Sequence, residues 1–501
     1  MRLSIRSSAT HVGGVKIHET FRVTELDAGH CVEPSRHDAL NGGFNSTTSR
    51  SNVAFSHESI HDVETQLAIV IPCMDEEQGL LDSVLHGVPH ECLIVLVSNS
   101  NPVNFEAECR LLADFCNDTQ RPGIVIHQRD EGLALAFHAA GMPEVVAETS
   151  QPQTKRGALR VRNGKGEAMM IGTAIAKLAG KHFIGFIDAD NFVAGSVHEY
   201  CKVYAAGLHY ALHCTENTGT TSSSDMAEST EMSYAMVRIK WNSKPKVKDG
   251  KLVFEKSGRC SRVVNEWMNR LLDALVGDIT ENRLIQTSNA GEHAMSLDLA
   301  MDLCFATGYA VEPFQLVNAW EQFGVRNIDN DQSLTTTVAQ QFYTAHTAFC
   351  KFGTTEDTGN FTQDINKSAT SLSAASHHSS VANPTRASTV QSPHNVRILQ
   401  IETRNPHFHD VSKGHEHIQR MQVEGLSTIY HSRLVPRKLK DELRGFMKEE
   451  FPTAVGIDGE PERPRVYPPM RTLDFGVFRS VVKDKADTLK VVGDFAGKSM
   501  L

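Results

Sequence analysis

The chain has 501 residues, of which 40% are hydrophobic and 22% are charged, and its formal net charge at pH 7 is −10. These values are typical of a globular protein with about two to four domains. The acidic balance argues against a surface for nucleic acid or anionic membrane, and no apolar run approaches the ~20 residues that span a bilayer. The 10 cysteines form no CxxC pair, so we expect reduced thiols and a cytoplasmic protein.

Apolar runs alternate with helical patterns in the first part of the chain. Residues 14–27 alternate between apolar and polar side chains and predict one or two strands, whereas residues 28–60, rich in Gly, Ser, Asn and His, predict a loop. Buried strands are predicted within 67–77, 91–100 and 123–130. This alternation predicts an α/β protein with a mostly parallel, Rossmann-like sheet.

The middle of the chain continues the same pattern. Residues 163–180 predict a helix opened by a Gly-rich turn, and FIGFIDAD at 183–190 predicts a buried strand that ends in two carboxylates. A further helix is expected over 258–276. Residues 284–314 predict a short strand, a loop, a helix and an extended piece, because Pro313 disfavours the helical region for the residue before it.

Two polar stretches interrupt the globular pattern. Residues 212–230 predict a surface insertion, and the Ser/Ala/Thr-rich residues 351–395 predict a disordered insertion. A strand is expected at 396–403, and one basic helix is expected over 429–450. The predicted organisation comprises N-terminal strands and a loop at 1–65, a catalytic α/β domain at 66–345, the insertion at 351–395, and a smaller C-terminal α/β part at 396–501 that completes the site.

The two carboxylates after the FIGFI run face the same way if the chain stays extended. Because alternate strand residues point to one side, Asp188 and Asp190 can both face one hard cation. An Asx turn at a solvated strand end is the alternative interpretation. Ligands of open α/β sheets bind at the carboxyl ends of strands, where residues 72–76 and Ser98 also follow predicted strands.

Two positively charged residues lie where helices are predicted to begin. Lys165, in a Gly-rich turn, suits a diphosphate through its ammonium and the backbone N–H groups, although a surface lysine is the alternative. Arg259, between Gly258 and Ser261, could hold a phosphate or carboxylate, or it could simply face solvent at a helix start. In an apolar context Glu312 requires a partner, which makes a role in the site plausible.

Histidines follow the strand predicted at 396–403. His407 and His409 occupy alternate positions, so either could face a metal site if the chain stays extended. A polar strand end without any metal is the alternative interpretation. Mg²⁺ usually keeps few protein ligands and is completed by phosphate oxygens and water, so the sequence pattern favours a phosphorylated ligand beside the carboxylates.

Eight sequence blocks in a fixed order resemble the mannosyl-3-phosphoglycerate synthase family. The resemblance extends from about residue 14 to 345 and again from 396 to at least 421, and it omits both predicted insertions. The blocks are VIPCMDEE, VLVSNS, RNGKGEAM, FIDADN, GRCSRVVNEW, NAGEHAM, GYAVEPFQLVN and IETRNPHFHD followed by KGHEHIQRM.

The resemblance implies a retaining glycosyltransferase with the GT-A nucleotide-diphospho-sugar transferase fold. Members of the family move mannose from GDP-mannose to the 2-hydroxyl of 3-phosphoglycerate and release GDP, a step in the biosynthesis of the compatible solute mannosylglycerate. Mg²⁺ or another divalent cation is implied as the cofactor. Neither nucleic acid nor a membrane is implied as a partner, and a homodimer is left open.

The resemblance also assigns residues to the site. It implies a metal site formed by Asp190 and His407, with His409 as the alternate ligand. The relatives often have threonine at the position of Ser261, which retains the hydroxyl. The implied donor-binding residues are Pro72, Met74, Glu76, Ser98, Lys165, Asp188 and Tyr309. The implied acceptor-binding residues are Gly258, Arg259, Ser261 and Asn289, and the implied catalytic residues are Asp188, Asp190, Glu312 and Asn289.

Three other functions compete with this interpretation. A glucosyl-3-phosphoglycerate synthase shares many of the blocks and differs in its nucleotide sugar. A sugar nucleotidyltransferase also combines a Gly-Lys turn with paired aspartates, but it would release inorganic diphosphate. A non-catalytic binding protein on the same fold is the third alternative, and the presence of Lys165, Asp188, Asp190 and Arg259 argues against it.

Overall fold

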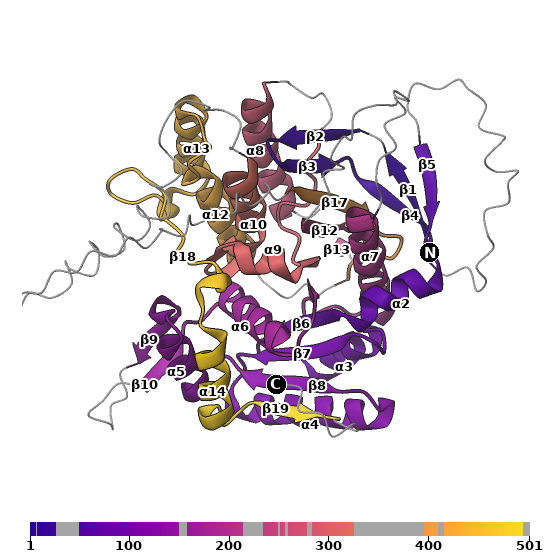
Figure 1. Ribbon diagram of the computed structural model, residues 1–501. Coiled ribbons are helices and arrows are strands. Elements are labelled where there is room, and N and C mark those ends of the chain that lie inside the picture. Colours follow the sequence, from indigo (N-terminus) through magenta and orange to yellow (C-terminus); the bar gives the residue numbers. More distant parts are fainter. Residues whose placement is uncertain are drawn as a thin grey trace, which may run out of the picture. The chain divides into compact units, whose positions relative to one another are not determined.

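A computed structural model describes residues 1–6, 8–26, 50–149, 158–213, 234–248, 251–255, 259–277, 283–324, 395–408 and 415–493. All of them belong to one compact unit built from Met1–Arg326 and His394–Leu501. Residues 214–230 and 351–394 of the two predicted insertions lie outside this described part. One large sheet runs through the unit in the order β19-β8-β7-β6-β11-β15-β12-β17-β4-β1-β5, with β3 beside β17 and β2 beside β3 (Figure 1).

Parallel strands form the part of the sheet that the apolar runs predicted. β6 pairs with β7 and β11, and β7 pairs with β8, all in parallel. The predicted α/β class with a Rossmann-like sheet is therefore confirmed. These strands are β6 (Leu67–Cys73), β7 (Leu93–Ser98), β8 (Gly123–His127) and β11 (Phe183–Phe186).

The sheet continues beyond β11 with a change of direction. β15 is antiparallel to both β11 and β12, and β12 is parallel to β17, so segments 162 residues apart in the chain become neighbours. These strands are β12 (Tyr234–Lys240), β15 (His293–Ser296) and β17 (Val396–Glu402). The remaining strands of the sheet are the N-terminal ones and the last one, namely β1 (Arg2–Arg6), β2 (Ala9–Val12), β3 (Val15–His18), β4 (Phe21–Glu25), β5 (Arg50–Ala54) and β19 (Lys490–Val492).

Helices cover both faces of the sheet, because alternate strand residues are apolar on both sides. In β6, Ile69 packs into one core and Val70 into the other. The first core includes α2 (His57–Thr65), α3 (Gln78–Gly87), α4 (Pro102–Thr119) and α7 (Ala194–His213). The second includes α5 (Glu131–Ala139), α6 (Lys165–Leu178), α8 (Arg259–Val276), α9 (Leu297–Asp302), α10 (Val311–Ala319), α12 (His415–Tyr430), α13 (Arg437–Glu450) and α14 (Phe475–Lys485).

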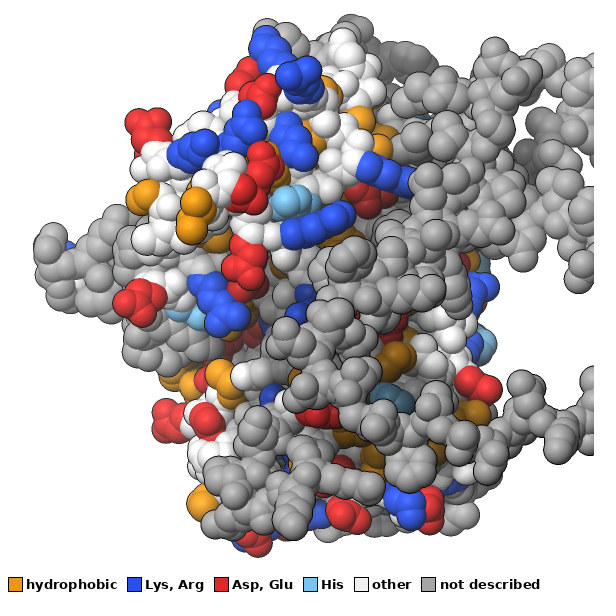
Figure 2. Space-filling model, turned by 90° about the vertical axis from the view of Figure 1, so that its left-hand side faces the viewer, with side chains coloured by type: hydrophobic (Ala, Val, Ile, Leu, Met, Phe, Trp, Pro, Cys, Tyr) orange, Lys and Arg blue, Asp and Glu red, His pale blue; other side chains and the backbone are white. Residues whose placement is uncertain are grey.

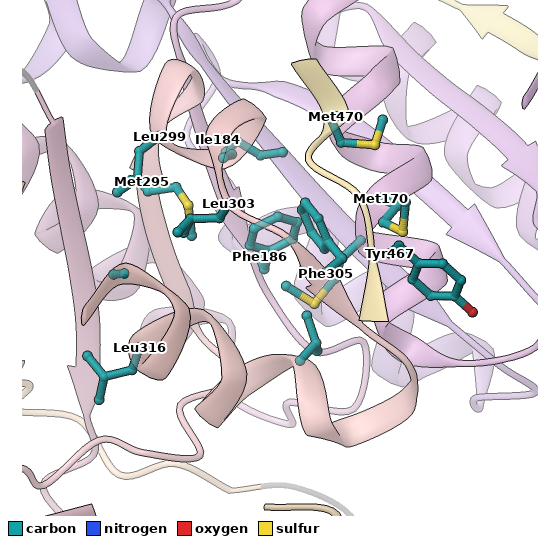
Figure 3. Close-up of a cluster of buried hydrophobic side chains, with 14 of the residues drawn as sticks. Met170, Ile184, Phe186, Met295, Leu299, Leu303, Phe305, Leu316, Tyr467 and Met470 are labelled. Carbon is teal, nitrogen blue, oxygen red and sulfur yellow. The ribbon is translucent and has the colours of Figure 1, made fainter. Parts of the chain in front are cut away.

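The second core joins distant parts of the chain beneath the candidate site. Figure 3 shows Phe186 of β11 beside Phe305 and near Tyr467, all within one apolar cluster. Each of these three side chains is fully buried, so the C-terminal segment is packed into the same core as the parallel strands. The short strands are β9 (Val146–Thr149), β10 (Ala158–Val161), β13 (Lys244–Lys248), β14 (Lys251–Glu255), β16 (Phe305–Ala306) and β18 (Val466–Tyr467).

The prediction of a loop throughout 28–60 is wrong at its C-terminal end. Residues Arg50–Ala54 form β5, which pairs with the distant strand β1. α2 then begins at His57, where the Ser56 side chain accepts a hydrogen bond from the Ser59 N–H. The polar composition of this stretch gave no local signal for β5, which depends on a distant partner strand, or for the capped helix α2.

Two further predictions are wrong because of proline. Glu312 lies in helix α10 rather than in an extended piece, since Pro313 falls in the first helical turn, where its missing N–H needs no partner. The basic helix expected over 429–450 is two helices. α12 ends at Tyr430, and Pro436 directly precedes α13, because a proline inside a continuous helix would remove a backbone hydrogen bond.

Cysteines and surface charges agree with the composition. Among the described cysteines, free thiols are found at Cys73, Cys92, Cys109, Cys116 and Cys201, which are buried, and at Cys304, which is partly buried. On the face shown in Figure 2, the described basic and acidic side chains are interspersed rather than gathered by sign. In the described part of the chain, no helix is both long enough and apolar enough to cross a membrane.

Candidate functional site

The candidate site lies where β11 ends. Asp188 and Asp190 follow Phe186, the last residue of this strand, and the carboxyl ends of β6 and β7 lie beside it in the parallel sheet. Lys165, the first residue of α6, reaches this edge and contacts Asp188. The structure therefore brings together the acidic motif and the Gly-rich turn that the sequence analysis singled out.

Lys165 lies between two carboxylates. Its Nζ is 2.5 Å from Asp188 Oδ1 and 2.8 Å from Glu312 Oε1. The side chain of Lys165 is 11% exposed and that of Glu312 only 1%, so the alternative of a surface lysine is wrong. Burial lowers the pKa of Lys165, but the two carboxylates raise it more, and the pKa lies well above its ordinary value. The lysine therefore supplies a fixed positive charge.

Gly291 allows the segment before β15 to approach this ion pair. A Cβ atom at this position would lie 2.6 Å from Asp188 Oδ2 and 2.9 Å from Lys165 Nζ. Contacts that short would displace the two charged groups. The glycine therefore lets the backbone lie close to the Lys165–Asp188 pair without disturbing it.

Arg238 organises the same segment from within β12. Its fully buried guanidinium donates hydrogen bonds to the carbonyl oxygens of Thr287, Ser288 and Glu312 at 3.0–3.1 Å. Burial lowers the pKa of Arg238 to about 10, and the nearby Glu312 carboxylate partly opposes this change. The arginine remains charged at neutral pH and ties the start of α10 to the loop that carries Asn289.

Asn289 has a buried amide that lacks an internal partner. Its side chain is 3% exposed, and neither amide atom forms a hydrogen bond within the described residues. Two asparagines of α8 hold the adjacent backbone, because Asn265 accepts from Ser288 N–H at 2.9 Å and Asn269 accepts from Ile285 N–H at 2.8 Å. An unsatisfied buried amide is costly, so this group is suited to receive a ligand.

Helix α8 also carries the residues predicted to bind an acceptor. Arg259 is its first residue, and Ser261, one residue further into the helix than Cys260, is partly buried. Gly258 and the side chain of Arg259 lie outside the described part of the chain. Since Asn265 follows Ser261 by about one helical turn and bonds to Ser288, the start of α8 is close to the loop with Asn289.

The residues predicted to bind the nucleotide follow β6 and β7. Pro72 lies within β6, Glu76 is partly buried, and Met74 is 56% exposed. Ser98 is fully buried, and its Oγ accepts a hydrogen bond from Ser100 N–H at 3.2 Å. The Ser98 hydroxyl is thus engaged within the protein.

Asp75 fixes the turn between these two strand ends. Its φ of 56° is unusual for a residue other than glycine. Its Oδ1 accepts hydrogen bonds from Asn101 N–H at 2.9 Å and from the Asn104 side-chain amide at 2.8 Å. These bonds lower the pKa of Asp75, the Asn101 backbone bond being the largest cause. The exposed Met74 is therefore presented by a rigid turn.

Tyr309 lies on a turn that two glutamates hold. Glu424 of α12 accepts hydrogen bonds from Tyr309 N–H at 2.7 Å and Ala310 N–H at 3.1 Å. Glu167 of α6 accepts from the Thr307 hydroxyl at 2.5 Å. These contacts bring the predicted sugar-binding tyrosine beside the N-terminal turn of α6, where Lys165 begins the helix.

His407 adjoins the segment that carries Asp190. The backbone N–H of Phe192 donates to Phe408 O at 2.8 Å, and the Asn191 side-chain nitrogen lies 3.5 Å from His407 Nδ1. Asp190 is 7% exposed and His407 is 3% exposed. Two segments more than 200 residues apart are thereby joined at the position where the sequence predicts a metal.

The donors around Asp190 and His407 fit a cation that shares its coordination with a ligand. No group of three or more His, Cys, Asp or Glu side chains among the residues that the structure describes could hold a metal alone. Asp188 pairs with Lys165, and the Asp190 carboxylate and the His407 imidazole are a pair of possible ligands. Mg²⁺ and Mn²⁺ accept such donors, and substrate phosphates and water complete the sphere around Mg²⁺. The alternate ligand His409 lies outside the described residues.

Several residues of the site were not found from the sequence. Arg238 carried a usable signal, since it is a charged residue in the interior of the apolar strand YAMVRIK. Glu167, Glu292 and Glu424 carried none, because their partners lie far away in the chain. A charged residue inside a predicted buried strand is thus a useful indicator of a site when it occurs.

Comparisons with known proteins relate the chain to one family. The model of the family described as mannosyl-3-phosphoglycerate synthase matches residues 5–482. The mannosyl-3-phosphoglycerate synthase of Pyrococcus furiosus is 32% identical, with the match covering 95% of this chain and 96% of that protein. The enzyme of the same name from Aeropyrum pernix is 27% identical, over 97% of this chain and 99% of its own length.

A solved structure was also matched. Glucosyl-3-phosphoglycerate synthase from Mycobacterium tuberculosis, in complex with phosphoglyceric acid, is 14% identical with a TM-score of 0.40, over 84% of this chain and 96% of that chain. The same enzyme in complex with Mn²⁺, uridine diphosphate and glucosyl-3-phosphoglycerate is 15% identical with a TM-score of 0.39, over 84% and 96%.

The class of protein follows from the fold, the site and the sequence matches. An α/β sheet with an acidic motif and a lysine at its carboxyl edge, in a chain that matches a family of synthases over nearly its full length, defines a glycosyltransferase. The chain belongs to the mannosyl-3-phosphoglycerate synthase family.

Proposed function

We propose that this protein transfers mannose from GDP-mannose to the 2-hydroxyl of 3-phosphoglycerate, giving mannosyl-3-phosphoglycerate and GDP. The observation that carries the proposal is the 32% identity to a mannosyl-3-phosphoglycerate synthase over 95% of the chain. A divalent cation, Mg²⁺ or Mn²⁺, would be the cofactor, and cytoplasmic synthesis of mannosylglycerate would be the context. The charged groups at the end of β11 support the proposal, because both substrates are phosphorylated.

The donor would bind across the carboxyl ends of β6, β7 and β11. Met74 and Glu76 would contact the guanosine, and the exposure of Met74 supports this role. Asp190 and His407 would hold the cation, which supplies positive charge to the departing diphosphate when bound. Lys165 would add a fixed charge at the same place, since it is nearly buried and stays protonated.

The acceptor would bind between the start of α8 and the following loop. Arg259 and the first N–H groups of α8 suit the phosphate of 3-phosphoglycerate. Ser261 would add a hydroxyl. The unpartnered amide of Asn289 would then gain hydrogen bonds from the acceptor, and its burial supports that role.

The reaction would proceed on one face of the sugar. The bond from the mannose anomeric carbon to the diphosphate oxygen breaks as the bond to the acceptor 2-oxygen forms on the same side. The departing diphosphate oxygen takes the proton of the acceptor hydroxyl, so no protein base is needed. The contact of Glu312 with Lys165 at 2.8 Å supports this course, because an ion-paired carboxylate is a poorer nucleophile. A trapped covalent mannosyl-Glu312 would overturn it.

One incubation tests the proposed function. Purified protein receives Mg²⁺ and 3-phosphoglycerate with GDP-mannose, GDP-glucose or UDP-glucose, and GDP or UDP release is measured together with the phosphorylated glycoside. We expect turnover with GDP-mannose and an α-linked product by NMR. Preferred use of a glucose donor would assign the protein to the glucosyl alternative, and release of inorganic diphosphate from GTP and mannose 1-phosphate would indicate a nucleotidyltransferase.

A variant tests the metal assignment within the same assay. Asp190→Ala should abolish the cation-dependent turnover, and a circular dichroism spectrum should remain that of the parent. The variant is matched by Asp62→Ala, since Asp62 lies on α2, away from the β11 edge. Near-normal turnover of Asp190→Ala would refute Asp190 as a ligand.

A further inference from the structure

Four elements converge on the imidazole of His407. Trp241 follows β12, Glu292 precedes β15, Tyr200 lies on α7, and His407 lies beyond β17. Glu292 and Tyr200 are fully buried and His407 is 3% exposed. Burying a carboxylate with an imidazole, a phenol and an indole costs free energy of folding unless these groups interact with one another.

Trp241 links the carboxylate and the imidazole. Its indole N–H donates a hydrogen bond to Glu292 Oε2 at 2.9 Å. Its ring also stacks on His407, with centroids 4.3 Å apart and planes inclined by 16°. Trp241 therefore restricts the plane of the imidazole and the position of the carboxylate at once.

Three polar groups lie near Nδ1 of His407. The Tyr200 hydroxyl oxygen is 3.1 Å away, the Asn191 side-chain nitrogen is 3.5 Å away, and the carboxylate atom Glu292 Oε1 is 3.7 Å away. A negative carboxylate beside Nδ1 favours a proton on that nitrogen, because the N–H dipole points toward the charge. The other ring nitrogen, Nε2, then presents its lone pair on the opposite edge of the ring.

We propose that Glu292 is a positioning residue, which keeps the proton on Nδ1 of His407 so that Nε2 is a ligand for the divalent cation. This inference rests on the proposed function, since that function supplies the cation. A carboxylate that orients a ligating histidine in this way fixes both the tautomer and the ring direction. Glu292 itself touches neither substrate nor cation in this scheme.

The backbone that carries His407 is independently fixed. Glu199 of α7 accepts hydrogen bonds from Arg404 N–H at 2.6 Å and Asn405 N–H at 2.8 Å. The backbone N–H of His407 donates a hydrogen bond to the carbonyl oxygen of Ser243 at 2.9 Å. Because these bonds hold the main chain, only the rotation of the His407 ring and its tautomer remain variable. Glu292 and Trp241 determine both.

The opposite tautomer gives a clear contrast. If Tyr200 donated its hydroxyl hydrogen to Nδ1, the proton of the neutral ring would lie on Nε2, and that nitrogen could not bind a cation. In that case Tyr200→Phe would affect His407 most. If Glu292 selects the tautomer, Glu292→Gln has the larger effect, because it removes the charge while preserving an oxygen for the Trp241 N–H.

The test measures cation binding without turnover. Mn²⁺ is titrated into full-length protein with saturating GDP, and free Mn²⁺ is followed by its electron paramagnetic resonance signal. The variants are Glu292→Gln, Trp241→Phe and Tyr200→Phe, and Glu64→Gln is the matched control. Glu64 is also a buried carboxylate, but it pairs with Lys202 on the far side of α7 from this cluster. Thermal unfolding without Mn²⁺ is recorded for each variant.

We expect Glu292→Gln to weaken Mn²⁺ binding roughly 10- to 100-fold and Trp241→Phe to weaken it several-fold. Tyr200→Phe and Glu64→Gln should bind within about twofold of the parent. Equal binding by Glu292→Gln and the parent would overturn the inference, as would a larger loss in Tyr200→Phe than in Glu292→Gln. If the parent protein itself bound no Mn²⁺ with GDP, the cation requirement of the proposed function would be refuted first, and the role of Glu292 with it.

Discussion

Lys165 Nζ lies 2.8 Å from Glu312 Oε1, although the two residues are 147 positions apart in the chain. The contact joins the start of α6 to the first turn of α10, on opposite sides of the acidic motif. It also neutralises a carboxylate that is almost completely buried. The Lys165–Glu312 pair therefore stabilises the fold and also fixes a positive charge in the site.

Replacing the lysine separates these two contributions. Lys165→Met should lower the free energy of unfolding by about 3 kcal/mol, because Glu312 would be left buried and without its counter-charge. The double variant Lys165→Met with Glu312→Gln should recover most of that loss in urea denaturation. Both variants should remain defective in GDP release, since the fixed positive charge of Lys165 is absent from both. Recovery of turnover in the double variant would show that Lys165 acts on Glu312 alone.

Arg238 should be essential for the loop that carries Asn289. Arg238→Lys keeps the charge but cannot reach the carbonyl oxygens of Thr287, Ser288 and Glu312 together. Losing these bonds should cost about 3 kcal/mol or more of stability, and it should raise KM for the acceptor about tenfold.

Arg121→Lys is the matched control for Arg238→Lys. Arg121 is also buried and donates to the carbonyl oxygens of Val88 and Cys92. The control should lose stability in thermal unfolding without any change in KM for the acceptor. A similar KM for the acceptor in Arg238→Lys and Arg121→Lys would contradict the role of Arg238 in the site.

Asn289 gives the clearest separation between stability and function. Asn289→Ala should leave the free energy of unfolding within about 1 kcal/mol of the parent, or raise it, because the amide has no internal hydrogen bond to lose. kcat/KM for the acceptor should fall at least ~10-fold, since a hydrogen bond to a bound ligand is worth about 1.5 kcal/mol. A strongly destabilised variant with normal kinetics would show that Asn289 only packs the loop.

Local patterns in the sequence were sufficient for much of the fold. The apolar runs predicted β6, β7, β8 and β11, because parallel strands buried on both faces need continuous apolar side chains. The placement of Asp188 after β11 and of Lys165 at the start of α6 followed from the same patterns. Their mutual contact is new, since periodicity locates a residue within an element but does not identify its partner across the sheet.

Features that depend on distant partners could not be predicted. β5 is a strand because β1 lies beside it, and its own polar sequence gives no sign of this. Glu424 reaches the backbone of Tyr309 over 115 positions, and Arg238 reaches Glu312 O over 74. Each contact is specified by the packing of two helices or strands, which a single local window does not contain.

His293 should make the protein sensitive to acid. Burial, and to a smaller extent the positive charge of Arg238, lower its pKa to about 3, while an exposed histidine has a pKa of about 6.5. Between these values the unfolded chain binds more protons than the folded protein, so stability is complete above pH 6.5 and is lost as the pH falls toward 3. The expected loss from this residue is roughly 3 kcal/mol between pH 7 and pH 4.

The variant His293→Asn isolates this contribution. Its side-chain amide can replace the Nδ1–H that lies 2.9 Å from Ala290 O, but it does not titrate. The stability advantage of the parent over the variant should therefore shrink by roughly 3 kcal/mol between pH 7 and pH 4, measured by urea denaturation at each pH. All other titrating groups are common to both proteins and cancel in the difference. Parallel stability curves over this range would mean that His293 is already protonated in the folded protein at pH 4, in conflict with its burial beside Arg238.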